Sequence, residues 1–176
     1  VMLVRHGEPW EVDSSGVLLS PLARGVVADV PLLTGPDFSR LRAGTQVRTV
    51  EVRRGLAWVR ALGAPDLQLA GEVSEVDVAA ADSTAILLMD GTRVLAPAWP
   101  PEARVLSALR VVLKDLPNRQ VRPGAVDLRF EDLVVVQPAR GVAPASPAPG
   151  PTSGVEPPSG GTGAVRTGPD GVRRSG

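Results

Sequence analysis

The amino-acid sequence predicts an α+β fold, in which a curved, mixed or antiparallel β-sheet packs against two amphipathic helices and precedes a disordered tail. Three observations support this fold class. Short apolar runs bounded by turn residues are typical of strands, and apolar residues recur at helical spacing in two segments. Residues 138–176 are dominated by Pro, Gly, Ser, Thr and Ala, and contain too few large apolar groups to offset the entropy of ordering.

The first half of the chain contains the weaker signals. Residues 12–19 are predicted to form two strand pieces around a Ser-Gly turn, and a helix is predicted within residues 47–62. Gly55 costs this helix about 1 kcal/mol relative to alanine, because glycine loses more backbone freedom on folding. The predicted apolar face comprises Val52, Leu56, Val59 and Leu62, and the predicted solvated positions are Arg48, Arg53, Arg54 and Arg60.

The second half of the chain begins with a strand and a hairpin. Residues 75–78 form a short alternating run, and two apolar runs follow at residues 85–89 and 93–96. Asp90-Gly91 joins these two runs, and this dipeptide is typical of tight hairpins because both central residues of the turn need positive φ.

A second helix and the final strands follow. Pro117 and Asn118 are expected to end the helix, and strands are predicted at residues 126–130 and 133–136. The apolar residues at helical spacing are Val105, Leu106, Leu109, Val112, Leu113 and Leu116.

Composition excludes several classes of function. Nineteen basic and nineteen acidic side chains give a formal net charge of zero, so no basic surface for nucleic acid is expected. The chain has no cysteine and one histidine, so thiolate chemistry and multi-histidine zinc sites are excluded. No glycine-rich phosphate loop is followed by Lys-Ser or Lys-Thr. We therefore expect no cofactor, no metal and no catalytic residue.

The order of the segments resembles the C-terminal, extracytoplasmic β domain of the FtsQ/DivIB family of bacterial cell division proteins. The resemblance extends over residues 12–137. The segments that carry it are Val30-Pro-Leu-Leu-Thr-Gly35, Ala57-Trp-Val-Arg-Ala-Leu62, Val76-Asp-Val78, Asp90-Gly91 and Val126-Asp-Leu-Arg-Phe130, followed by a valine-rich strand.

The resemblance implies a non-enzymatic scaffold of the divisome, active in septum assembly, that binds FtsB/DivIC and FtsL outside the cytoplasmic membrane. It also implies an N-terminal cytoplasmic tail, one membrane helix and a POTRA domain upstream. We expect the chain to be a fragment of such a single-pass inner-membrane protein, with this domain on the extracytoplasmic side. Residues 1–11 are then the end of an upstream domain or a first strand, residues 12–137 the β domain, and residues 138–176 the tail.

The last strand is the predicted binding site. If the predicted disordered tail follows it, its outer backbone groups form an open edge to which a partner can add a strand. The resemblance implies the same mode, with FtsB/DivIC supplying the strand. Phe130 is the expected anchor because an aromatic side chain buries a large area. The predicted partner-binding residues are Phe130, Leu133, Val134, Val135, Val136 and Gln137.

Two alternatives stay open at the level of sequence. Arg5-His6-Gly7 is similar to the opening motif of histidine phosphatases and predicts a hydrolase, although that family's second histidine has no counterpart here. The other alternative is a generic structural β module of an envelope protein, without a divisome partner.

Overall fold

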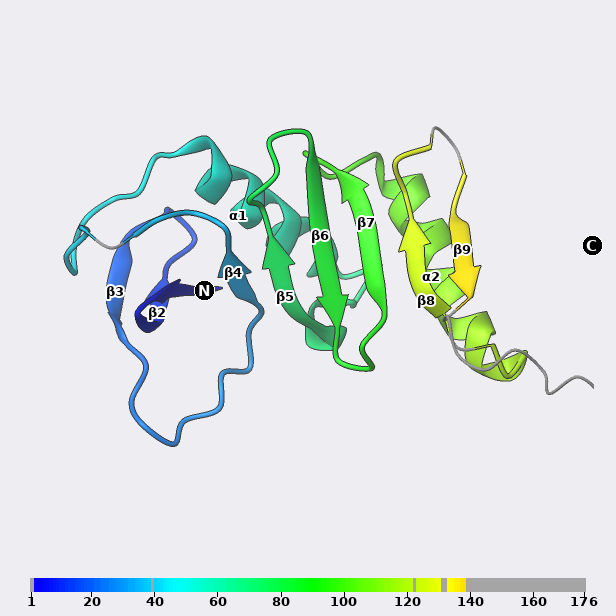
Figure 1. The fold of residues 1–176 in the computed structure, drawn as a ribbon, viewed down its shortest axis with the longest axis horizontal. Helices are drawn as coiled ribbons and strands as arrows, with labels where there is room; N and C mark the ends of the chain where they lie inside the picture. The colour runs from blue at the N-terminus through cyan, green and yellow to red at the C-terminus, as the bar shows by residue number, and fades with distance from the viewer. Residues whose placement is uncertain (1, 39, 122, 131–132, 139–176) are drawn as a thin grey trace, which may run out of the picture. The chain divides into compact units, whose positions relative to one another are not determined.

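The computed structural model describes residues 2–38, 40–121, 123–130 and 133–138, all within one compact unit, Val1–Gly141. Nine strands form one sheet in the order β3-β2-β1-β4-β5-β6-β7-β8-β9 (Figure 1). The strands are β1 Met2–His6, β2 Glu8–Val12, β3 Leu18–Pro21, β4 Leu32–Thr34, β5 Val73–Asp77, β6 Ser83–Leu88, β7 Arg93–Pro97, β8 Pro123–Asp127 and β9 Val135–Pro138.

The sheet is mixed. The pairs β1/β4, β4/β5 and β7/β8 are parallel, and the remaining pairs are antiparallel. With the helices α1 (Val50–Leu62) and α2 (Ala103–Asn118) and a short 3₁₀ helix, Ala70–Glu72, the predicted α+β class is confirmed. Apart from Pro138, the predicted tail lies outside the described residues.

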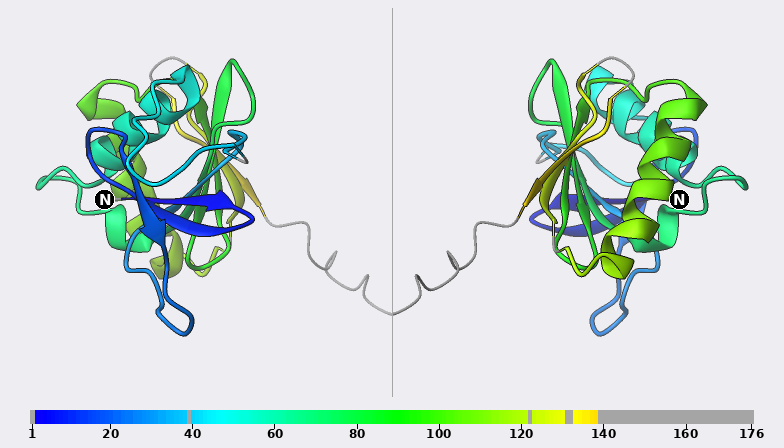
Figure 2. Two further views of the ribbon diagram at one scale, coloured as in Figure 1. Left: turned by 90° about the vertical axis from the view of Figure 1, so that its left-hand side faces the viewer. Right: turned by 90° about the vertical axis from the view of Figure 1, so that its right-hand side faces the viewer.

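Both long helices lie on the same face of the sheet (Figure 2). The sheet presents to them a row of fully buried aliphatic residues that are direct neighbours across six strands. Because neighbouring residues of one strand point to opposite faces, this row fixes which side chains face the helices. The row consists of Val4, Leu33, Val76, Ile86, Val94 and Val126.

The contact of α1 with the sheet corrects one prediction and explains another residue. Arg54, predicted to be solvated, is buried, and its guanidinium donates to the carbonyl oxygens of Val78, Ala80 and Ala81 at 2.6, 2.8 and 2.7 Å. The prediction was wrong because the loop after β5 presents carbonyl oxygens to this helix face. Gly55 allows close approach: a Cβ there would lie 2.3 Å from Leu33 Cδ1.

Candidate partner-binding edge

The two edges of the sheet differ. The outer side of β3 is partly covered by its own chain, because Leu18 N–H donates to the Thr45 carbonyl and Gly44 N–H donates to the Leu18 carbonyl, at 2.9 and 2.7 Å. On β9, no strand of the described ranges pairs with the outer side. The free edge that the sequence predicted at the C-terminal end of the sheet is therefore present in the described structure.

The register determines which backbone groups of β9 face outward. Leu128 N–H donates to the Leu95 carbonyl of β7 at 2.7 Å, so Asp127, one residue earlier, directs its backbone groups towards β9. Asp127 is opposite Val135, and antiparallel pairs alternate between bonded and non-bonded. Val135 and Gln137 therefore face β8, and Val136 faces outward. Since Pro138 has no N–H, Val136 supplies the outward donor within β9.

The structure places the predicted residues partly in β9 and partly just before it. β8 ends at Asp127 and β9 begins at Val135, so the strands are shorter than predicted at these ends. Phe130, Leu133 and Val135 are 52%, 60% and 37% exposed, which is high for apolar side chains near a strand. Val134 packs against the core, Val136 is partly buried, and Gln137 is exposed.

Two hollows flank the predicted residues and meet at the start of α2. One, of about 390 Å³, lies between Phe130 and the segment before α2 and is lined by Pro97, Pro101, Glu102, Arg104, Val105, Leu128, Arg129 and Phe130. The other, of about 170 Å³, separates Val134 from α2 and is lined by Arg104, Val105, Ala108 and Val134. No described residue of β9 lines either hollow, and the second hollow reaches Val134, the residue just before this strand.

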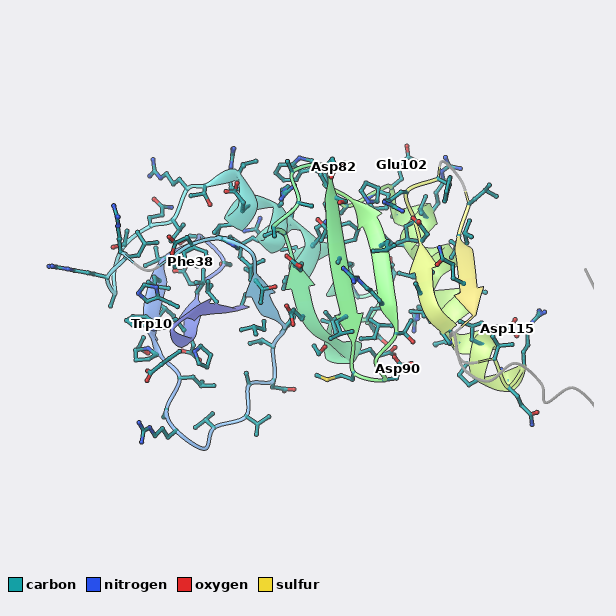
Figure 3. All side chains as sticks on the ribbon, in the orientation of Figure 1. Trp10, Phe38, Asp82, Asp90, Glu102 and Asp115 are labelled. Atoms are coloured by element: carbon teal, nitrogen blue, oxygen red, sulfur yellow. The ribbon has the colours of Figure 1, made fainter. Side chains whose placement is uncertain are left out.

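The α2 side of these hollows was not predicted as part of the site. Figure 3 shows Glu102 at the start of α2, towards the same end of the sheet as Asp82, and Asp115 towards the other end. Arg104 and Ala108 are exposed residues one helical turn apart, so their flank of α2 lies beside the predicted stripe. A helical-wheel reading identifies this flank, but only the position of Val134 shows that it borders the edge strand.

The charge pair beside the edge is local to the end of β8. The Arg129 guanidinium donates from Nε to Asp127 Oδ1 at 3.0 Å and from Nη2 to Oδ2 at 2.7 Å. The Arg129 backbone N–H also donates to Oδ1 at 3.0 Å. These bonds to Arg129 hold the pKa of Asp127 below its ordinary value, and the same pairing raises the pKa of Arg129.

The motif that predicted a hydrolase is far from this edge in the strand order. His6 ends β1, and its ring packs edge-on against Trp10, with the centroids 5.5 Å apart. Its Nδ1 is buried without a hydrogen-bond partner. An indole neither transfers protons nor neutralises a phosphoryl group, so this contact supplies none of the partners that phosphoryl chemistry needs. No cluster of three potential metal-ligating side chains occurs in the described part of the chain.

In the described structure, helices cover one face of the sheet and the outer side of β9 is unpaired, a geometry that is compatible with strand addition by a protein partner. The family model for the C-terminal region of the cell division protein FtsQ/DivIB matches residues 2–129, and the chain belongs to this family. No curated protein matches the chain. The family match ends one residue before Phe130, so all six predicted partner-binding residues lie just beyond it.

As a member of this family, the chain has a role in cell division. The family consists of non-enzymatic cell division proteins. Members of the family are membrane-anchored proteins with an extracytoplasmic domain. In the described residues, neither helix combines the length and the apolar character that crossing a bilayer requires.

Proposed function

We propose that this chain is a non-enzymatic divisome scaffold that binds FtsB/DivIC and FtsL by strand addition to β9. It acts in septum assembly, on the extracytoplasmic side of the inner membrane, and is held there by a single-pass anchor outside this sequence. The nine-stranded sheet with its two long helices, including β1 and β2, forms the binding module. The observation that supports this proposal most is the unpaired outer side of β9 in the described structure. Membership of a cell division family supports it as well.

The proposed interface depends on side chains as much as on the backbone. β9 has four residues, and within it Val136 supplies the outward N–H, so main-chain pairing offers few hydrogen bonds. The exposed apolar side chains of Phe130, Leu133 and Val135 supply area that loses water on binding. The hollow between Val134 and Ala108 accepts an aliphatic side chain from the inner face of the added strand.

The proposal is tested by removing the outward donor. Val136→Pro deletes the N–H that faces the partner and leaves the N–H groups of Val135 and Gln137 in place for β8. Val136→Ala is the matched control, because it shortens the same side chain and keeps the donor. The probe is the purified extracytoplasmic segment of the FtsB/DivIC protein of the same bacterium, and binding is measured by calorimetry.

We expect Val136→Pro to weaken binding at least tenfold more than Val136→Ala, with unchanged circular dichroism. Val135→Pro, which removes a donor that faces β8, should instead lower the melting temperature. Equal binding by the Val136→Pro and Val136→Ala proteins would refute strand addition at this edge.

A further inference from the structure

Asp127 is the one acidic side chain that is buried among the described residues. It lies opposite Val135 of β9 and beside Leu95 of β7, on the sheet face that the helices leave uncovered. Arg129, whose side chain is 49% exposed, covers it. Burying a carboxylate is unfavourable unless the charge is paired, so a buried carboxylate on an otherwise open face needs an explanation.

A matched aspartate shows that the turn forms without a guanidinium bonded to the aspartate carboxylate. Asp77 ends β5 as Asp127 ends β8, and both residues lie in one row across the sheet. Asp77 Oδ1 accepts the Ala79 N–H at 2.9 Å, as Asp127 Oδ1 accepts the Arg129 N–H at 3.0 Å. Each aspartate forms an Asx-type turn. After β5 the Arg54 guanidinium bonds to backbone carbonyl oxygens of the loop, whereas after β8 the Arg129 guanidinium bonds to the aspartate itself.

We propose that the Asp127–Arg129 pair positions the partner-binding edge. The two guanidinium contacts hold Leu128–Phe130 against the end of β8 and thereby fix where the chain enters β9. The consequence for partner binding rests on the proposed strand addition, but the positioning role itself does not.

The contacts around Arg129 show how the segment is held. The Leu128 N–H donates to the Leu95 carbonyl at 2.7 Å, and the carbonyl of Phe130, two residues later, accepts the Leu133 N–H at 3.3 Å. Arg129 lies between these points, and Asp82 in the loop before β6 attracts it further. An edge that is ordered before the partner arrives loses less conformational entropy on binding, so affinity should depend on this local pair.

Asp127→Asn isolates the charge pair. Asparagine keeps a side-chain oxygen for the Arg129 N–H and removes the carboxylate charge that the guanidinium needs. Asp77→Asn is the matched control, because Asp77 forms the same turn and the arginine at that loop, Arg54, bonds to backbone carbonyl oxygens. Two quantities are measured for each protein: amide hydrogen exchange along β6 to β9, and affinity for the purified extracytoplasmic segment of FtsB/DivIC.

We expect Asp127→Asn to accelerate exchange at the Val135 and Gln137 amides roughly tenfold, and to weaken binding by a similar factor. Exchange in β6 and β7 should stay at the wild-type rate, and Asp77→Asn should change neither quantity. Arg129→Lys, which keeps the charge without the planar fork, should fall between wild type and Asp127→Asn.

The outcomes separate this inference from the proposed function. Unchanged exchange at Val135 and Gln137, or equal acceleration throughout β6 to β9, would overturn the positioning role whether or not the partner binds. Faster exchange with unchanged affinity would overturn its consequence for binding. Absence of binding by the wild-type chain would refute strand addition, and the exchange rates would still decide the role of Asp127.

Discussion

The substitution Gly55→Ala tests whether α1 and β4 are in close contact. Helix propensity alone predicts stabilisation, because alanine is favoured over glycine in a helix interior by about 1 kcal/mol. The structure predicts that Gly55→Ala destabilises the protein instead. A Cβ on Gly55 would lie 2.3 Å from Leu33 Cδ1, 3.0 Å from Cδ2 and 3.2 Å from Cγ.

The size of the effect follows from the surroundings of Leu33. Its side chain is fully buried and belongs to the row of aliphatic residues beneath the helices, so it has no solvent to move into. Overpacking of this kind costs about 1–3 kcal/mol, from which the gain in propensity of about 1 kcal/mol is subtracted. We expect a net loss of about 1 kcal/mol in the free energy of unfolding, or about 4 °C in melting temperature.

Urea denaturation followed by circular dichroism measures this loss, with Gly71→Ala as the control. A Cβ on Gly71 meets no atom within 4 Å, so that variant should be at least as stable as wild type. Shortening the obstructing side chain should relieve the clash, and the pair Gly55→Ala with Leu33→Val should lose less than the sum of the single losses. A Gly55→Ala protein more stable than wild type would refute the close contact.

Two further predictions concern the core and the charge pair. Leu109→Asp should unfold the domain, because Leu109 is 1% exposed and an unpaired carboxylate there costs several kcal/mol, on the order of the whole stability. Val111→Asp, on the exposed side of α2, should melt near the wild-type temperature. Equal melting temperatures of the two variants would show that the buried face of α2 has been assigned wrongly. Arg129 depresses the pKa of Asp127 below 3.8, so the stability that Asp127→Asn removes should be constant between pH 7 and 5 and should shrink as the pH falls through the folded-state pKa. If urea denaturation gives the same difference between the two proteins at pH 2 as at pH 7, the carboxylate charge is not its source.

The two helices, the hairpin and the last two strands form near the positions that local sequence patterns predict, although several of their ends differ. The hairpin between β6 and β7 forms where Asp90-Gly91 predicts it, but its turn differs: Gly91 adopts φ +86°, whereas Asp90 lacks the positive φ that was expected of both residues. The predicted stripe of α2 includes Leu106, Leu109 and Leu116, which are buried. Pro117 lies inside α2 instead of ending it, and the helix continues to Asn118. Local patterns set element type well because each depends on neighbours within a few residues.

The errors arise where distant segments meet. Arg54 is typical of a solvated helix position until the carbonyl oxygens of the loop at residues 78–81 are placed beside it. Gly55 is a defect in an isolated helix and becomes a requirement only against Leu33 of β4. For the site, the edge strand could be predicted because it is the last apolar run of the chain. The flank of α2 at Ala108 could not, because nothing local relates it to Val134.

The free edge of β9 raises a question of specificity, since any exposed strand edge is also a template for unwanted pairing. Three features limit that risk here. β9 is four residues long, its last residue, Pro138, has no backbone N–H to donate, and Val136 supplies the outward N–H within the strand. Backbone pairing is therefore too sparse to select or hold a partner unaided. Selectivity then depends on side chains that fit the hollows beside Phe130 and Val134, so substitutions there should change which strand binds, while Val136→Pro should reduce binding of every strand.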